Sequence, residues 1–303
     1  KQKTAYEIKE CDWSSDVCSS DLHETSFAQV AADMLGVDVA QVKIIVGDTD
    51  IVAVGGGSHS GRSMRHAGTV IAIGSEELID KGKRIAALHF KVQLDRIAFD
   101  NGRFVVPGTN HAIDLFELGR VAMQMELPDD LKGGLAIARE NEMHDPVFPN
   151  GTAICEVEID PDTCEMKLVG YSTVDDVGRC INPMIVHGQT HGGVVQGLGQ
   201  AIYELCALEP TTGQPLAGSF MDYGMPRAND IPFIRAEISE VLSPTNPLGV
   251  KAGGEGGTTP ALSALVASVV DALKPYGVTH IEDRKSTRLN SSHIPLSRMP
   301  SSA

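Results

Sequence analysis

The chain has 303 residues, of which 42% are hydrophobic, and a formal net charge of −15 at pH 7. This acidic balance argues against non-specific binding to nucleic acid, which requires a positively charged surface. No apolar run approaches the roughly 20 residues that a membrane-spanning helix needs. What remains is a water-soluble protein with one large domain or two smaller ones.

The two ends of the chain look foreign to the rest. Residues 11–21 can be written in codons whose reverse complement, read in a shifted frame, encodes residues 283–293. Two segments encoded by opposite strands of one oligonucleotide resemble translated sequencing adapter. We therefore predict that about 1–22 and 283–303 are artefactual and disordered, and we base the fold on 23–282. The alternative is a real motif at Cys11 and Cys18, whose C-x6-C spacing matches no common metal framework.

Helix and strand patterns alternate from residue 23 onward. Apolar residues at helical spacing predict a helix over 25–35, ended by Gly36. Residues 42–46 are typical of a strand. A loop rich in glycine and serine, 55–61, then leads into a predicted helix over about 63–90.

A hairpin and a short helix are expected next. Residues 97–106 predict a hairpin with Asn101-Gly102 as its turn, because this pair favours the type I′ geometry. Residues 112–125 predict a short helix. The polar, turn-rich stretch 128–149 is the best candidate for a junction between two subdomains, at about 23–130 and 150–282.

The second half begins with another hairpin, 152–159 paired with 165–173. Asn182-Pro183 predicts the start of a helix that runs to about residue 205. Glycine costs about 1 kcal/mol relative to alanine inside a helix, so its repeated use here indicates close packing against backbone or cofactor. The glycines concerned are Gly188, Gly192, Gly193, Gly197 and Gly199. The predicted fold class is α+β.

One carboxylate, Glu255, stands in a glycine-rich segment ahead of a mostly apolar helix over 261–273. Thr259 is predicted as the N-cap of this helix, with Pro260 at its first position. A carboxylate surrounded by glycine is a candidate general base facing a large ligand. The alternative is a tight loop whose glutamate caps a helix.

A second glycine-rich loop suggests an anion site. Residues 56–63 nearly match the P-loop pattern G-x-x-x-x-G-K-[ST], but Arg62 stands where the lysine should be. A more general hypothesis is that the loop presents backbone N–H groups and hydroxyls to a polar ligand, with Arg62 as a forked donor to phosphate.

Side-chain metal sites are weakly indicated. His187 and His191 are spaced i, i+4, but no third ligand stands nearby. The acidic pairs Asp48/Asp50 and Asp175/Asp176 are more typical of loop caps than of magnesium ligands. The four cysteines outside the terminal segments form no C-x-x-C pair, which is typical of reduced thiols in a cytoplasmic protein.

Taken together, five segments resemble the large subunits of the molybdenum hydroxylases, the family of xanthine dehydrogenase, aldehyde oxidase and aerobic carbon monoxide dehydrogenase. They occur in the family's order and cover nearly all of 23–282. The segments are HETSFAQ (23–29), VDDVGRCINPM (174–184), GGVVQGLGQAIYE (192–204), GSFMDYGMPRA (218–228) and GVKAGGEGG (249–257).

The resemblance implies roles for individual residues. Glu255 would be the general base, and Gln196 with Gly197 would contact the pterin near the molybdenum. Cys180 and Asn182 would contact the dinucleotide end of the cofactor. The residues implied to line the pterin or its pyrophosphate are Ser60, Gly61, Arg62 and Ser63.

The resemblance also implies a chemistry and a set of partners. The cofactor would be molybdenum–molybdopterin in its cytosine dinucleotide form, with no side-chain ligand to the metal. An aldehyde or N-heterocycle would be hydroxylated with oxygen from water, and electrons would leave through 2Fe-2S and FAD partners. The N-terminal half of the large subunit is missing, so the chain alone is expected to be inactive. Two alternatives remain, a P-loop-like nucleotide-binding protein and a non-catalytic assembly paralogue.

Overall fold

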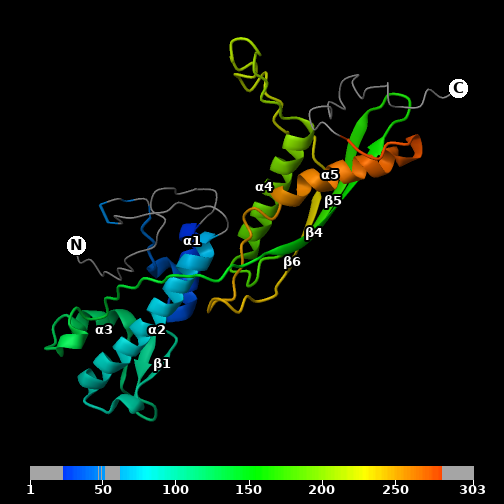
Figure 1. The fold of residues 1–303 in the computed structure, drawn as a ribbon. Coiled ribbons are helices and arrows are strands. Elements are labelled where there is room, and N and C mark those ends of the chain that lie inside the picture. The colour runs from blue at the N-terminus through cyan, green and yellow to red at the C-terminus, as the bar shows by residue number, and fades with distance from the viewer. Residues whose placement is uncertain (1–22, 47, 49, 52–61, 282–303) are drawn as a thin grey trace. The chain divides into compact units, whose positions relative to one another are not determined.

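The computed structural model describes residues 23–46, 48, 50–51 and 62–281. Both terminal segments interpreted as adapter lie outside these residues, as do Ser60 and Gly61. The chain divides into two compact units, drawn together in Figure 1. The first runs up to Val147 and includes Leu242–Val250; the second comprises Phe148–Val241 and the chain from Lys251 onward.

The sequence predicts a single junction between the two subdomains at 128–149. In the structure, the later segment Leu242–Val250 also belongs to the first unit. The cause is a contact with the long helix α2, Arg62–Phe90. A Cβ on Gly68 of that helix would lie 2.7 Å from Leu248 Cδ1, so the leucine occupies the space that the glycine leaves. Asn246 closes the segment on itself, because its side chain donates to Val250 O at 2.9 Å and accepts from Val250 N at 3.0 Å.

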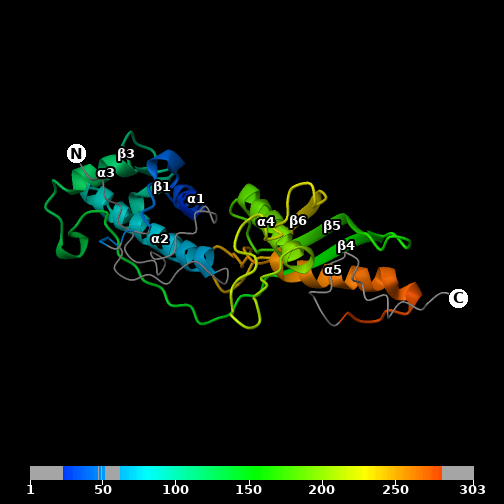
Figure 2. The ribbon, with the colours of Figure 1, turned by 90° about the horizontal axis from the view of Figure 1, so that it is seen from above.

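The first unit consists of helices around a small antiparallel sheet with strand order β1-β2-β3. Helix α1 lies alongside α2, as Figure 2 shows. Asn101 and Gly102 both have positive φ, at 43° and 74°, which confirms the predicted hairpin turn. The elements are α1 His23–Leu35, α2 Arg62–Phe90, β1 Ala98–Asp100, β2 Arg103–Val105, β3 Ala112–Asp114 and α3 Leu115–Ala122.

One prediction for this unit was wrong, because residues 42–46 form no strand: no described segment pairs with their backbone. Apolar residues alone do not create a strand without a partner for its N–H and C=O groups. The short helix predicted within 112–125 is confirmed as α3, which starts at Leu115 because Ala112–Asp114 forms strand β3. Asp114 marks that boundary, since its Oδ1 accepts from Glu117 N at 2.8 Å.

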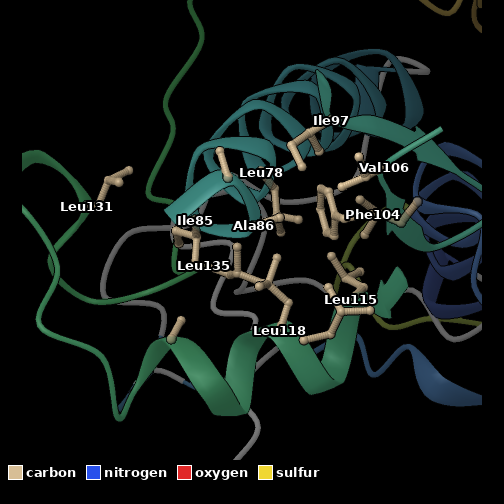
Figure 3. Packing of buried hydrophobic residues seen from close by; sticks show 14 residues of the cluster. Leu78, Ile85, Ala86, Ile97, Phe104, Val106, Leu115, Leu118, Leu131 and Leu135 are labelled. Atoms are coloured by element: carbon tan, nitrogen blue, oxygen red, sulfur yellow. The ribbon is translucent and has the colours of Figure 1, made fainter. Parts of the chain in front are cut away.

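The core of this unit forms where side chains from α2, β2 and α3 meet around Phe104 (Figure 3). Phe104 is fully buried, and a Cβ on Gly82 of α2 would overlap its ring. Gly82 therefore provides the space in which the aromatic ring packs against the helix. Ile85, Leu115 and Leu118 complete the contact.

The second unit has a three-stranded sheet with order β4-β5-β6, in which β4 pairs antiparallel and β6 parallel with β5. Helices α4 and α5 pack on each other, and α5 lies over β4 (Figure 1). Their shared core includes Tyr171, Leu198 and Leu265. The opposite face of the sheet exposes Ile154, Val169 and Val174. The elements are β4 Asn150–Ile159, β5 Met166–Asp176, α4 Pro183–Ile202, β6 Ile234–Ser239 and α5 Thr258–Leu273.

The packing of Phe104 gives a test of the first unit. Gly82→Ala should lower the free energy of unfolding by about 1–3 kcal/mol, because the new methyl group overlaps a buried ring. Gly74→Ala in the same helix is the control, since its Cβ would meet only Ile137 Cγ2 at 4.0 Å. That variant should gain up to about 1 kcal/mol from helix propensity. Urea unfolding followed by circular dichroism measures both; equal stabilities would contradict this account of Gly82.

Candidate functional site

Glu255 lies in a turn, residues 254–257, that leads directly into α5. Its side chain is exposed. The prediction of Thr259 as the N-cap was wrong, because α5 begins at Thr258 and the capping position is Gly257. Thr259 instead fixes the turn: its backbone N and its Oγ1 both donate to Glu255 O, at 3.2 and 3.1 Å. The backbone of the candidate base is thus tied to the helix that follows.

Glycines allow the Glu255 turn to pack directly on the backbone of α4. A Cβ on Gly257 would lie 2.9 Å from Val194 N, and one on Gly193 would lie 3.0 Å from Thr258 N. A Cβ on Gly197 would lie 2.7 Å from Ala261 Cβ. These glycines therefore mark a close contact between α4 and α5. Gly188 and Gly192, by contrast, have no neighbour within 4 Å of a Cβ position.

Gln196 is brought next to the same turn. Thr258 Oγ1 donates to Gln196 Oε1 at 3.2 Å, and Thr258 is only three residues from Glu255. The side-chain amide nitrogen of Gln196 donates to none of the described residues, so it can donate to a ligand. Three of the predicted site residues, Glu255, Gln196 and Gly197, therefore belong to one contact between two helices.

A cavity of about 890 Å³ opens beside Gln196 at the end of α4. That volume lies within the range of small-molecule and cofactor sites. Tyr223 and Glu204 are joined across it, because Tyr223 OH donates to Glu204 Oε2 at 3.1 Å. The polar lining residues are Gln196, Gln200, Tyr203, Glu204, Asp222 and Tyr223.

Cys180 and Asn182 lie at the opposite end of α4. Asn182 caps the helix as predicted, since its Oδ1 accepts from Ile185 N at 3.1 Å. Cys180 N donates to Glu240 Oε1 at 2.5 Å. Burial raises the pKa of the Cys180 thiol, and the Glu240 charge raises it further. Fourteen residues of helix separate Asn182 from Gln196, roughly 21 Å, so the two cannot contact the same small group.

Arg62 and Ser63 form the first turn of α2 in the first unit, and Ser63 is buried. The predicted site residues of the second unit are Cys180, Asn182, Gln196, Gly197 and Glu255. The glycine- and serine-rich loop 55–61 ahead of Arg62 lies outside the described residues. The strand that a P-loop would need before it, 42–46, does not form.

Sequence reasoning missed an ion pair beside the Glu255 turn. Asp176 and Lys251 meet with Nζ and Oδ2 2.5 Å apart, and both side chains are only 11% exposed. The acidic pair 175–176 had been interpreted as loop caps, and Asp176 does accept from Gly178 N at 2.9 Å. The available signal was a single lysine inside a glycine-rich segment, four residues before Glu255.

Within the described residues, no three histidine, cysteine or acidic side chains are grouped so as to hold a metal ion. The rings of His187 and His191 lie 6.4 Å apart, centroid to centroid. No helix in the described ranges is long and apolar enough to cross a membrane.

A family model described as the molybdopterin cofactor-binding domain matches residues 23–232. The chain belongs to this family. The predicted family resemblance and the α+β class are confirmed, and the P-loop alternative is not supported. The molybdopterin-binding chain is 33% identical over 255 residues to the 6-hydroxypseudooxynicotine dehydrogenase complex subunit gamma of Paenarthrobacter nicotinovorans. That match covers 82% of this chain and 32% of the relative.

Solved structures show the same fold. A Cu,Mo-CO dehydrogenase in its carbon monoxide reduced state matches 89% of this chain and 34% of its own, with a TM-score of 0.80 and 29% identity. Quinoline 2-oxidoreductase from Pseudomonas putida 86 matches with a TM-score of 0.74 and 31% identity, covering 86% of this chain and 34% of its own. The molybdopterin-binding chain thus spans about a third of the length of these relatives.

The buried carboxyl group of Asp175, beside the Glu255 turn, gives a prediction about stability and pH. Burial raises its pKa, against the opposing effect of the hydrogen bond from Thr173 Oγ1 at 3.1 Å. A raised folded-state pKa favours the neutral acid, so ionisation above it costs stability. Asp175→Asn should therefore raise the melting temperature at pH 7.

That gain should shrink as the pH falls from the raised pKa of Asp175 toward about 3.9, the ordinary pKa of aspartate, and should vanish below it, because Asp175 is then protonated in both states. Thermal unfolding between pH 3 and pH 7 measures it. Asp145→Asn, at an exposed position, should change little at either pH. A variant less stable than the wild type at pH 7 would contradict the raised pKa.

Proposed function

We propose that the chain is the C-terminal, cofactor-binding portion of a molybdenum hydroxylase large subunit. The complete enzyme would oxidise an aldehyde or an N-heterocycle with oxygen from water, in the cytoplasm. The observation that carries this proposal is the position of Glu255. Its side chain is exposed, while Thr259 donates to its backbone carbonyl and Gly257, two residues further on, packs against α4. A catalytic base needs this combination of access and fixed position.

The residues present fit a bound molybdopterin cofactor. Gln196 offers an amide beside the Glu255 turn, and the cavity next to it is large enough for a pterin-sized group. When bound, the cofactor supplies the two-electron oxidation and the site at which water-derived oxygen is used. Glu255 would receive the proton released in that reaction, and Gln196 would hold the pterin by hydrogen bonds. Arg62 and Ser63, with Ser60 and Gly61, remain proposed contacts to the pterin or its pyrophosphate.

The cytosine dinucleotide form is proposed from the family resemblance, and the length of α4 supports a ligand longer than a pterin. A ligand that reached both Gln196 and the Cys180–Asn182 end would have to span roughly 21 Å along the helix. A pterin alone is too short, whereas a pterin extended by a nucleotide approaches that length. The neutral Cys180 thiol and the Asn182 amide would then act as uncharged contacts near the nucleotide.

Two observations support the proposal of partner chains: the printed names of the relatives and the apolar side chains that this chain exposes. One relative is named as a subunit of a dehydrogenase complex, and the chain covers about a third of the length of the relatives described above. Large apolar side chains stand open to solvent here, among them Phe220, Met221 and Phe233 at 82%, 93% and 81% exposed. We propose that the rest of the large subunit covers this surface and that separate 2Fe-2S and FAD subunits accept the electrons.

Replacing the proposed base tests the reaction directly. In the full-length large subunit assembled with its partners, Glu255→Gln should lower kcat by about 10²–10⁴-fold, because the amide cannot accept the proton. Molybdenum content should stay at the wild-type level. Steady-state kinetics with benzaldehyde and quinoline, together with metal analysis, measure both. Glu158→Gln, at an exposed position on β4, is the control for loss of a carboxylate. Wild-type turnover in Glu255→Gln would reject Glu255 as the base.

The cofactor assignment has a test that does not depend on turnover. Gln196→Ala removes the amide proposed to hold the pterin, so the assembled enzyme should lose a measurable part of its molybdenum. Acid hydrolysis of the wild type should release CMP in proportion to molybdenum, measured by liquid chromatography and mass spectrometry. Release of no nucleotide would reject the dinucleotide form, and unchanged molybdenum in Gln196→Ala would reject the Gln196 contact.

A further inference from the structure

The segment that carries Glu255 begins at a buried ion pair. Lys251 Nζ lies 2.5 Å from Asp176 Oδ2, and each side chain is 11% exposed. The backbone is held at the same point, because Lys251 N donates to Val177 O at 2.8 Å. Two residues later, a Cβ on Gly253 would lie 3.1 Å from Val177 Cγ1, so this part of the segment runs against the end of β5.

The Asp176 carboxylate joins three parts of the chain. Its Oδ1 accepts from Gly178 N at 2.9 Å and from Val241 N at 3.1 Å, while its Oδ2 accepts from Lys251 Nζ. Val241 is the last residue before the Leu242–Val250 segment and Lys251 is the first after it. One carboxylate therefore holds both ends of that segment. Burial raises the pKa of Asp176, but the Lys251 hydrogen bond and charge and the two N–H donors outweigh it and keep the pKa below its usual value.

The other end of the segment is fixed by packing. Gly257 lies against the backbone of α4 near Thr190 and Val194, with no room for a side chain. Between the two anchors, Gly254 has nothing within 4 Å of a Cβ position and Glu255 is exposed. The seven residues 251–257 thus form a bridge, a segment whose two ends are fixed by contacts and whose middle residues are exposed to solvent.

We propose that the Asp176–Lys251 ion pair is a positioning device that holds Glu255 in the geometry needed to act as a base. This inference rests on the proposed function of Glu255. Lys251 acts through the backbone of the bridge, because its own charge is neutralised by Asp176 and its side chain is buried. A fixed start at Lys251 restricts the path of the four residues that lead to Glu255. A reacting group displaced by about 1 Å can lose on the order of a hundredfold in rate.

The variants separate charge from packing. Lys251→Met keeps the apolar stem and removes the charge, whereas Lys251→Arg keeps the charge. Asp176→Asn keeps an oxygen that can accept from Gly178 N and Val241 N, and it gives a second, independent way to break the pair. Lys132→Met is the matched control: Lys132 and Asp129 are also 2.5 Å apart, but their side chains are 71% and 92% exposed in the other unit.

The first measurement is hydrogen exchange of the cofactor-free, full-length large subunit, followed by mass spectrometry. Lys251→Met and Asp176→Asn should speed exchange of peptides that cover 252–257, while Lys251→Arg and Lys132→Met should match the wild type. Unchanged exchange in both charge-removing variants would overturn the inference, whatever Glu255 does. If Lys251→Met fails to fold, the exchange rate of the same peptides in Asp176→Asn tests the inference.

The second measurement is steady-state kinetics of the assembled enzyme with benzaldehyde and quinoline and a dye acceptor. Lys251→Met should lower kcat by on the order of ten- to a hundredfold, with KM within about twofold and molybdenum content unchanged. Lys251→Arg should recover most of the turnover. The double variant Asp176→Asn/Lys251→Met should be no slower than the slower single variant, because both remove one interaction.

The outcomes distinguish this inference from the proposed function. Wild-type turnover in Lys251→Met, with Glu255→Gln inactive, overturns the positioning role and leaves Glu255 as the base. Wild-type turnover in Glu255→Gln overturns the proposed function of Glu255 as the base. If hydrogen exchange is still faster in Lys251→Met, the ion pair holds residues 251–257 in place, but that segment carries no catalytic carboxylate. If the wild type turns over neither substrate, the exchange measurement alone decides.

Discussion

The contact between α4 and α5 is the constraint on which the second unit depends. The two helices approach backbone to backbone, and this is possible only because Gly193, Gly197 and Gly257 stand at the points of contact. Each helical glycine costs about 1 kcal/mol in propensity, and the close approach offsets that cost through packing. The same contact sets Gln196 beside the turn that carries Glu255. Fold and candidate site thus share one physical cause.

Local features could be predicted from the sequence, because they depend on residues that are neighbours in the chain. The hairpin turn at Asn101-Gly102 follows from the left-handed conformations that these residues tolerate, and the Asn182 cap from its side-chain oxygen. The family resemblance likewise rested on contiguous motifs. Features that depend on a partner far along the chain could not be predicted. Residues 42–46 are rich in valine and isoleucine, as strands are, but a strand exists only where another segment pairs with it.

The candidate site shows the same division. Glu255 was identifiable because a single carboxylate among glycines is unusual within one segment. The Asp176–Lys251 pair was not, because 75 residues separate its members and either residue alone resembles an ordinary surface charge. The N-cap at Thr259 failed for a related reason. Gly257 packs on α4, and α5 starts two residues earlier than the local sequence favours.

The exposure of Glu255 bears on how the complete site would work. Electrostatic and proton-transfer effects are strongest where water is excluded, and an exposed carboxylate lacks that surrounding. The second unit fixes the carboxylate in position but does not enclose it. We propose that polypeptide outside the second unit encloses the carboxylate in the complete enzyme, and Phe220, Met221 and Phe233 offer apolar surface for such a contact. On this proposal, positioning and desolvation of the candidate base are divided between separate parts of the complete enzyme, and the second unit supplies the positioning.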